Sequence, residues 1–117
     1  MPFQRFLDQL TRDVEGLEGV LLLDAEGEVA FESGVPDDRQ RLIGAYQGIA
    51  LAAVRRAMRR HAMGGIRYLI CRYQGGQVIL RPLKDGYFLV LSLVPGASLA
   101  QGLRRSAQTQ EQVNVAL

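Results

Sequence analysis

Residues 38 to 62, DRQRLIGAYQGIALAAVRRAMRRHA, have the composition of one long helix with apolar side chains on more than one side. At about 100° per residue, one continuous stripe is apolar enough to lie on a sheet. Its members are Leu42, Tyr46, Ile49, Ala50, Ala53 and Ala57. A helix that must be covered on two sides constrains the fold more than any other stretch of this chain.

The opposite side of the same helix is unlike a solvated surface, because it carries glycines and further apolar residues. It consists of Gly44, Gln47, Gly48, Leu51, Val54, Arg55 and Met58. Each glycine costs a helix interior about 1 kcal/mol relative to alanine. Glycines four residues apart let another backbone approach closely, so we expect this side to face a partner helix. The alternative is that both sides are covered within one chain, but 117 residues leave little sequence to do so.

The length and composition predict one domain spanning residues 1–117, since 48% of the residues are hydrophobic and can form a core. No apolar run approaches the ~18 residues that span a bilayer, so we expect no membrane insertion. The N-terminus lacks the apolar core of a signal peptide. The single cysteine cannot form an internal disulfide. Together these features predict a cytoplasmic protein.

Charge is distributed unevenly along the chain. Residues 1–38 contain ten acidic and two basic residues, whereas residues 39–117 contain two acidic and twelve basic residues. Such a division favours self-complementary or electrostatically steered protein contacts. A nucleic-acid partner is the weaker alternative, because the cluster Arg55, Arg56, Arg59 and Arg60 has no interleaved aromatic residues. We therefore predict no nucleic-acid binding.

Periodicity and turn residues predict eight elements. Helices are expected at 3–16, 38–62 and from Leu99 towards Val115, and strands at 19–24, 28–32, 66–73, 77–83 and 87–94. Ser33, Gly34, Val35 and Pro36 are expected to break the second strand, and Asp37 with Gln40 resembles a capping box. The apolar density of 87–94 predicts a central strand. The last helix has a weak stripe (Leu99, Leu103, Ala107 and Val113), and its polar run QTQEQVN predicts fraying or a surface position.

This order predicts an α+β fold, α-β-β-α-β-β-β-α, with a five-stranded antiparallel sheet. The long central helix is expected on one face of the sheet and the two terminal helices on the other.

Residues suited to catalysis or metal binding are sparse. His61 and Cys71 are the only histidine and cysteine, so one chain cannot supply a four-ligand His/Cys metal site. We interpret His61 as a residue near a helix C-terminus and Cys71 as a small buried side chain. The carboxylates of Asp24, Glu26, Glu28 and Glu32 are expected to form a solvated acidic edge, with weak cation binding as the alternative. We predict no catalytic, metal-binding or cofactor-binding residues, and no enzymatic activity.

The chain resembles the roadblock / dynein light-chain family from Phe6 to about Leu103, and three stretches carry the resemblance. They are GVLLLDAEGEVAFES, IGAYQGIALAAV and GGQVILRPLKDGYFLVLSLVPGASLAQGL. In that family a hydrophobic strand ends in a D-x-x-G turn, here Asp24 to Gly27. A strand of the pattern dG-x-L-v-v-l follows the last turn, here Asp85 to Leu91.

The resemblance implies a homodimer in which the third strand pairs edge to edge with its copy and the long helices pack together. The interface would comprise Gly44, Gln47, Gly48, Leu51, Val54, Arg55, Met58, Tyr68 and Ile70. It also implies no cofactor, and a partnership with a small Ras-like GTPase. The chain lacks the long extensions of some GTPase-regulating members, so a direct GTPase-activating role, with an inserted arginine from the Arg55–Arg60 cluster, is not expected.

The leading hypothesis is therefore a non-enzymatic homodimeric adaptor that binds a small Ras-like GTPase or a related signalling or motility partner. The alternative is a small-molecule-sensing domain, which requires a roomy pocket, or a purely structural dimerisation domain.

Overall fold

Helices and strands follow one another in the predicted order. The computed structural model describes residues 2–34 and 37–117. Its elements are α1 (Pro2–Asp13), β1 (Leu17–Leu23), β2 (Val29–Gly34), α2 (Asp38–Arg60), β3 (Leu69–Tyr73), β4 (Gly76–Pro82), the short 3-10 turn η1 (Lys84–Gly86), β5 (Phe88–Leu93) and α3 (Leu99–Ala116). The expected strand break falls partly on Val35 and Pro36, which lie outside the described residues. The predicted α+β class is confirmed.

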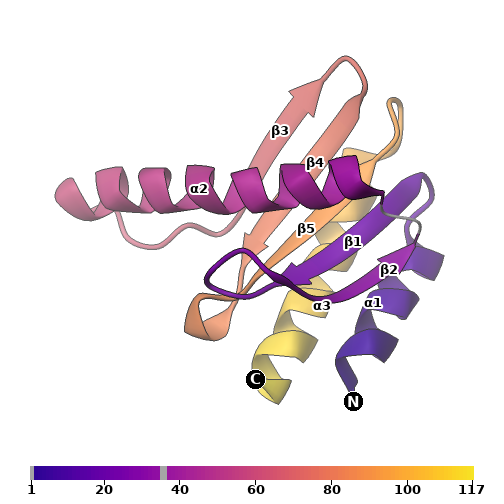
Figure 1. The fold of residues 1–117 in the computed structure, drawn as a ribbon, viewed down its shortest axis with the longest axis horizontal. Helices are drawn as coiled ribbons and strands as arrows, with labels where there is room; N and C mark the ends of the chain where they lie inside the picture. The colour runs from indigo at the N-terminus through magenta and orange to yellow at the C-terminus, as the bar shows by residue number, and fades with distance from the viewer. Residues whose placement is uncertain (1, 35–36) are drawn as a thin grey trace.

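The strands form one antiparallel sheet in the order β2-β1-β5-β4-β3 (Figure 1). β5 lies in the middle, as its apolar density predicted, and all of its residues are buried. A strand with neighbouring strands on both sides and helices over both faces is buried throughout, so most of its residues are apolar. β2 and β3 are left as the two edges.

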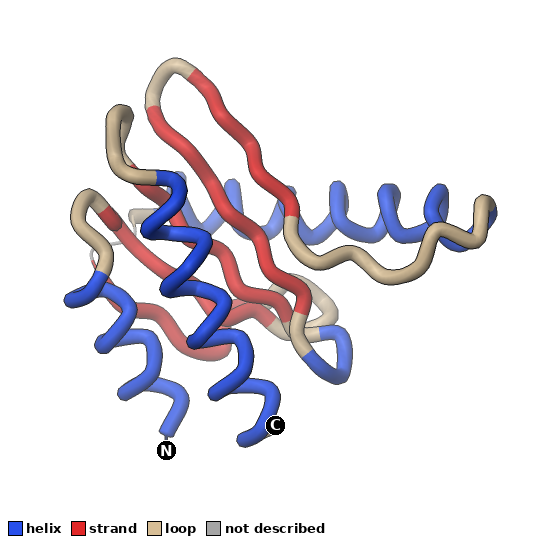
Figure 2. The backbone as a smooth tube through the Cα atoms, turned by 180° about the vertical axis from the view of Figure 1, so that it is seen from behind, coloured by secondary structure: helices blue, strands red, loops and turns tan. Residues whose placement is uncertain are grey.

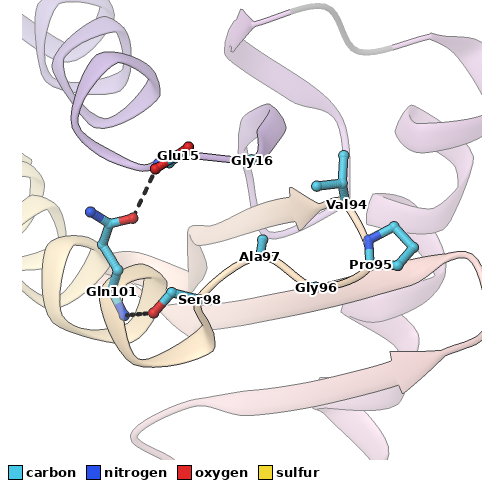
Figure 3. Close-up of a pocket in the computed structure, with 8 residues that line it drawn as sticks. All are labelled: Glu15, Gly16, Val94, Pro95, Gly96, Ala97, Ser98 and Gln101. Atoms are coloured by element: carbon cyan, nitrogen blue, oxygen red, sulfur yellow. Dashed lines mark hydrogen bonds between the residues drawn. The ribbon is translucent and has the colours of Figure 1, made fainter.

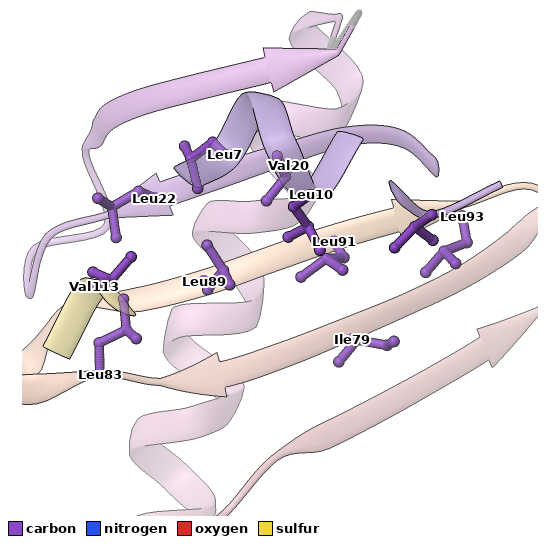
Figure 4. Close-up of a cluster of buried hydrophobic side chains, with 11 residues drawn as sticks. Leu7, Leu10, Val20, Leu22, Ile79, Leu83, Leu89, Leu91, Leu93 and Val113 are labelled. Carbon is purple, nitrogen blue, oxygen red and sulfur yellow. The ribbon is translucent and has the colours of Figure 1, made fainter. Parts of the chain in front are cut away.

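Helices cover the two faces of the sheet as predicted. α1 and α3 lie side by side on one face, and α2 lies alone on the other (Figures 1 and 2). The core beneath α1 and α3 draws apolar side chains from both helices and from four strand or turn segments (Figure 4). Its fully buried members are Leu7, Leu10, Val14, Val20, Leu22, Ile79, Leu83, Leu89, Leu91, Leu93 and Val113.

A second, smaller core lies between α2 and the other face of the sheet. It comprises Leu21, Leu23, Leu51, Val78, Leu80, Phe88 and Val90. Six of these seven residues come from strands, so α2 contributes one large buried side chain to its own core.

The turns have the geometry their sequences predict. The Asp24 carboxylate accepts hydrogen bonds of 3.0 Å from the backbone N–H groups of Glu26 and Glu28, and Gly27 adopts a φ of +83°. At η1, Asp85 and Gly86 both adopt left-handed backbone angles, which closes the hairpin between β4 and β5.

Of the two expectations for the polar run of the last helix, fraying is wrong, whereas a surface position is confirmed for Gln108, Glu111 and Gln112, which are exposed. α3 continues to Ala116, and Thr109 and Val113 are buried in its final turns. Its polar residues are used for anchoring, because Gln110 donates a 2.6 Å hydrogen bond to the Pro82 carbonyl and Asn114 accepts one of 2.8 Å from the Lys84 N–H.

The prediction that Cys71 is buried is also wrong. Cys71 is exposed because β3 is an edge strand, and an apolar strand at an edge is covered less than the same sequence at the centre. Within the described residues, no helix is long and apolar enough to cross a membrane.

Candidate interaction surface

The N-terminal end of α2 is fastened to β1 and β2. The Asp37 carboxylate accepts the Gln40 N–H at 2.8 Å, which is one half of the predicted capping box. The other half is absent, because the Gln40 side chain donates to Glu18 at 2.6 Å instead. Arg41 binds Glu32 of β2 through two hydrogen bonds of 2.7 and 2.9 Å. The hydrogen bond from Arg41 lowers the pKa of the Glu32 carboxyl.

The side of α2 that carries the glycines faces its own sheet. A Cβ on Gly44 would lie 2.9 Å from Leu21 Cδ1, and one on Gly48 would lie 2.7 Å from Phe88 Cζ. Leu51, two turns after Gly44, is 2% exposed within the same core. The prediction that these residues face a partner helix is therefore wrong. α2 lies close to the sheet because the strands supply the large side chains of this core and the helix supplies glycines.

The stripe that was expected to lie on the sheet points away from it. Leu42, Tyr46 (61% exposed) and Ile49 (66% exposed) are open to solvent, as are Ala50, Ala53 and Ala57. The prediction for this stripe is wrong because both sides of α2 are apolar, and side-chain size alone selects the wrong one. We call Leu42, Tyr46, Ile49 and Ala53 the outward face.

One flank of α2 points towards β3. Arg41 lies on the opposite flank, against β2, whereas Ile43 borders a hollow with Tyr73 of β3. Helical spacing continues the β3-side flank through Gln47, Ala50 and Val54. We call Ile43, Gln47, Ala50 and Val54 the β3 flank. It includes Gln47 and Val54 of the predicted interface, and Ala50 and Val54 are exposed along it.

The C-terminal part of α2 runs past the sheet (Figures 1 and 2). Leu51 is the last buried residue of the helix, and the residues after it are taken as the overhang. Residues 52–60 form this overhang, which is roughly 14 Å long at about 1.5 Å per residue. The segment after the helix folds back beneath it, so that Arg55, Gly65 and Ile66 border a common hollow. Arg55 and Met58 of the predicted interface are consequently half-buried, whereas their neighbours on the overhang are mostly exposed.

β3 is a regular edge strand with apolar side chains open on both of its faces. It pairs with β4 from Leu69 to Tyr73 without a register shift. Ile70 is 38% exposed on one face, and Cys71 and Tyr73 are exposed on the other. Tyr68, which directly precedes the strand, is exposed as well. A regular, apolar and open edge is a template for pairing with another strand.

The other edge, β2, is obstructed. Gln4 of α1 donates a 2.8 Å hydrogen bond to the Glu32 carbonyl. Asp8 accepts a 2.6 Å hydrogen bond from Ser33, which further ties α1 to the strand and lowers the pKa of the Asp8 carboxyl. The pairing with β1 is irregular between Leu22 and Leu23, where Ala30 is left without a partner. Bulges and covering side chains of this kind protect an edge from pairing.

The described part of the chain contains no group of three or more histidine, cysteine or acidic residues arranged to hold a metal ion. His61 forms the C-cap of α2. A shallow surface hollow of about 470 Å3 lies where the turn after α1 meets the start of α3 (Figure 3). Its lining is largely backbone, with Glu15 and Gln101 joined there by a 3.1 Å hydrogen bond. The space between α2 and the sheet is filled by the side chains of the smaller core.

The sequence profile of the Roadblock/LC7 domain matches residues 3–92. No curated protein matches the chain by sequence.

Several solved structures have a similar fold. MglB from Myxococcus xanthus is 14% identical, with a TM-score of 0.88 over 99% of this chain and 94% of that chain. A Roadblock/LC7 domain from Streptomyces avermitilis is 18% identical, with a TM-score of 0.86 over 97% of this chain and 95% of that one. An MglB described as having a tetrameric arrangement is 15% identical, with a TM-score of 0.84 over 97% and 88% of the two chains.

Proposed function

Because the chain belongs to the Roadblock/LC7 domain family, we propose that it is a non-enzymatic homodimeric adaptor for a small Ras-like GTPase or a related signalling partner. The observation that carries this proposal is the coincidence of an open β3 edge with an exposed β3 flank on α2. The resemblance noted from the sequence supplies the class of partner.

The dimer would form where β3 meets its copy. Pairing two β3 strands would satisfy the free backbone groups of both edges and extend the sheet to both subunits. The β3 flanks of the two α2 helices would then face each other over the joined sheet. Alanine at position 50 and valine at position 54 are small enough to permit close helix packing there. Tyr68 and Ile70 remain part of the proposed interface through their position at the β3 edge.

The overhang of α2 fits the same arrangement. Strands in a sheet are about 4.8 Å apart, so an overhang of roughly 14 Å would extend over up to three strands of a second copy. Arg55 and Met58 would lie near that second sheet. Within the described part of one chain, the overhang contacts the segment that follows α2, and most of its residues stay exposed.

We place the GTPase on the outward face of α2. Leu42, Tyr46 and Ile49 form an apolar strip that neither the sheet nor the proposed dimer would cover. Exposed Arg39 and Arg56 lie beside this strip, which suits a partner surface with acidic residues around an apolar centre. Two α2 helices side by side would present two such strips on one surface.

The small-molecule-sensing alternative receives no support from the packing, because seven buried side chains fill the space between α2 and the sheet. We also propose that residues 1–117 act as one domain. α3 lies entirely beyond the matched residues 3–92, yet it packs against α1 and β4. The lone cysteine is compatible with the cytoplasmic location we propose.

Two matched substitutions test the dimer. Val54→Glu places a charge on the β3 flank, and Ala53→Glu places the same charge on the adjacent residue of the outward face. Light scattering is expected to give a dimeric mass for the wild type and Ala53→Glu, and a monomeric mass for a folded Val54→Glu. A wild type that is monomeric at high micromolar concentration would contradict the proposal.

The GTPase is tested separately with purified small Ras-like GTPases from the same organism, loaded with GDP or a non-hydrolysable GTP analogue. Complex formation is measured by size-exclusion chromatography with light scattering. Ile49→Glu is expected to abolish the complex without changing the dimer, whereas Val29→Glu, at an exposed position on β2, is expected to leave it intact. The GTPase part of the proposal fails if no GTPase in either nucleotide state binds the wild-type dimer.

A further inference from the structure

Arg81 is a buried cation without an acidic partner. It is 6% exposed on the α3 side of β4, and burial lowers the pKa of its guanidinium. Its hydrogen bonds go to neutral acceptors: the Ser106 hydroxyl at 2.7 Å, the Leu103 carbonyl at 2.7 Å and the Gln110 side chain at 3.3 Å. In the described residues the ion pairs are those of Arg41, and none involves Arg81. An arginine remains protonated, so its charge stays uncompensated.

The surface beside Arg81 is an uncovered strip of sheet. The Tyr68 ring lies 5.2 Å from the Arg81 guanidinium carbon, and Ile70 and Arg72 pair with Ile79 and Gln77 of the same β4 face. Tyr68, Ile70 and Arg72 are all exposed. They form the β3 shelf, which is bounded on one side by α3.

α3 stops short of the β3 shelf because it packs tightly on β4 and β5. Gly102 allows this packing, since a Cβ there would lie 3.0 Å from Ile79 and 3.3 Å from Leu93. Leu99 and Leu103 remain half-buried, at the margin of the core. The shelf therefore has an apolar wall as well as an apolar floor.

The proposed dimer would join two shelves into one groove. α3 packs on both β4 and β5, so the axes of α3 and its copy would be about four strand spacings, or about 19 Å, apart. Packed helix axes lie about 8–10 Å apart, so three helices side by side need about 16–20 Å. The groove between α3 and its copy would thus take one helix, floored by Tyr68 and Ile70 from each subunit.

The groove is basic, so it favours a helix with acidic side chains. Residues 39–84 contain no acidic residue, and Glu111 is the only acid in α3. The groove would carry Arg72 at its floor and Arg81 beneath it, once from each subunit. A bound carboxylate would compensate charge that the chain itself leaves unpaired.

We propose that the α3 side of the dimer binds one acidic amphipathic helix of a partner protein, with its apolar face on Tyr68 and Ile70 and its carboxylates beside Arg72. This inference rests on the proposed homodimer, but it concerns the face of the sheet opposite to α2 and to the GTPase. One helix binds per two chains.

The test uses a synthetic probe peptide of about 14 residues, with leucines at helical spacing and glutamates elsewhere. A second peptide carries lysine in place of each glutamate. Isothermal titration calorimetry and light scattering are run on the same samples of full-length protein. The acidic peptide is expected to bind with one peptide per two chains, and the basic peptide is not.

Matched variants separate a specific groove from general charge attraction. Arg72→Glu and Arg56→Glu change the net charge equally, but Arg56 lies on α2. Arg72→Glu is expected to weaken binding at least about tenfold, and Arg56→Glu less than about twofold, since remote charges contribute little to a formed complex.

Each outcome is decisive. A monomeric mass overturns the proposed function, and the inference with it. A dimer that binds neither peptide, binds both equally, or loses affinity equally in both variants overturns the inference alone.

Discussion

The two halves of α2 share one helix but have opposite environments. The first half, to Leu51, lies on the sheet through two glycines and one buried leucine. The second half, residues 52–60, runs beyond the sheet and is mostly exposed. The first half is held by the chain's own core, whereas the second contacts the segment that follows α2 and leaves most of its residues exposed. In the proposed dimer, the exposed second half would be supported by the other subunit.

The two sides of α2 are expected to differ most in the stability cost of truncating a leucine. Leu51→Ala is expected to lower the free energy of unfolding by about 3 kcal/mol, because it removes a fully buried side chain and leaves a cavity. Leu42→Ala, the same change on the outward face, is expected to alter it by less than about 0.5 kcal/mol. Urea unfolding at fixed protein concentration measures both. Equal effects of the two substitutions would contradict the orientation of α2.

The close approach of the first half is tested at Gly48. Gly48→Leu is expected to cost about 2 kcal/mol, because the overpacking against Phe88 exceeds the gain in helix propensity. Gly65→Leu is the matched control, since a Cβ at that glycine would have no atom within 4 Å. If Gly48→Leu left stability unchanged while dissociating the dimer, Gly48 would lie at the interface and not on the sheet.

The rate of amide hydrogen exchange in the second half of α2 is expected to depend on protein concentration. Amide hydrogen exchange in residues 54–60 is expected to accelerate by about tenfold when the protein is diluted below its dimer dissociation constant, because the overhang then loses its support. Exchange in residues 44–51 is expected to change little. Mass spectrometry of peptides from the two segments measures the contrast, and a uniform response along α2 would remove the distinction.

The smallest expected effect on stability is that of the ion pair between Arg41 and Glu32, which holds the start of α2 against β2. Because Arg41 lowers the pKa of Glu32 in the folded state, the ion pair contributes stability above the unfolded-state value of 4.5, and this is lost as the pH falls through the folded-state pKa. The effect is small because both side chains are partly exposed. The urea midpoint of Glu32→Gln is expected to be slightly below that of the wild type at about pH 6 and equal to it at about pH 3. A gap that persists at the lower pH would contradict this assignment.

The sequence predicts the order of elements and the layers well, because long apolar runs and turn residues carry that information locally. The central position of β5 follows from its dense apolar residues, interrupted only by Ser92, and the Asp24 and Asp85 turns follow from their glycines. The orientation of α2 could not be predicted in the same way. Both of its sides are apolar, and the choice depends on Leu21 and Phe88, which are distant in sequence.

The sequence predicts only part of the candidate interface, because both sides of α2 are apolar. Gln47, Val54, Tyr68 and Ile70 stay in the proposed interface, whereas Gly44, Gly48 and Leu51 belong to the core. Cys71 was misassigned because the sequence of a strand does not reveal whether it lies at an edge. The burial of Thr109 in α3 was missed because a polar residue can be buried when its hydroxyl finds a nearby carbonyl, here that of Arg105.

The pairing of β3 with its copy is tested most directly at Cys71, the only cysteine, which lies at the middle of the strand and is exposed. A nitroxide label there requires no substitution. In any antiparallel pairing centred within β3, the two Cys71 backbones lie within about 15 Å of each other. Continuous-wave electron paramagnetic resonance is expected to show dipolar broadening that disappears when labelled chains are mixed with excess unlabelled protein. A labelled protein of dimeric mass with no broadening would contradict pairing through β3.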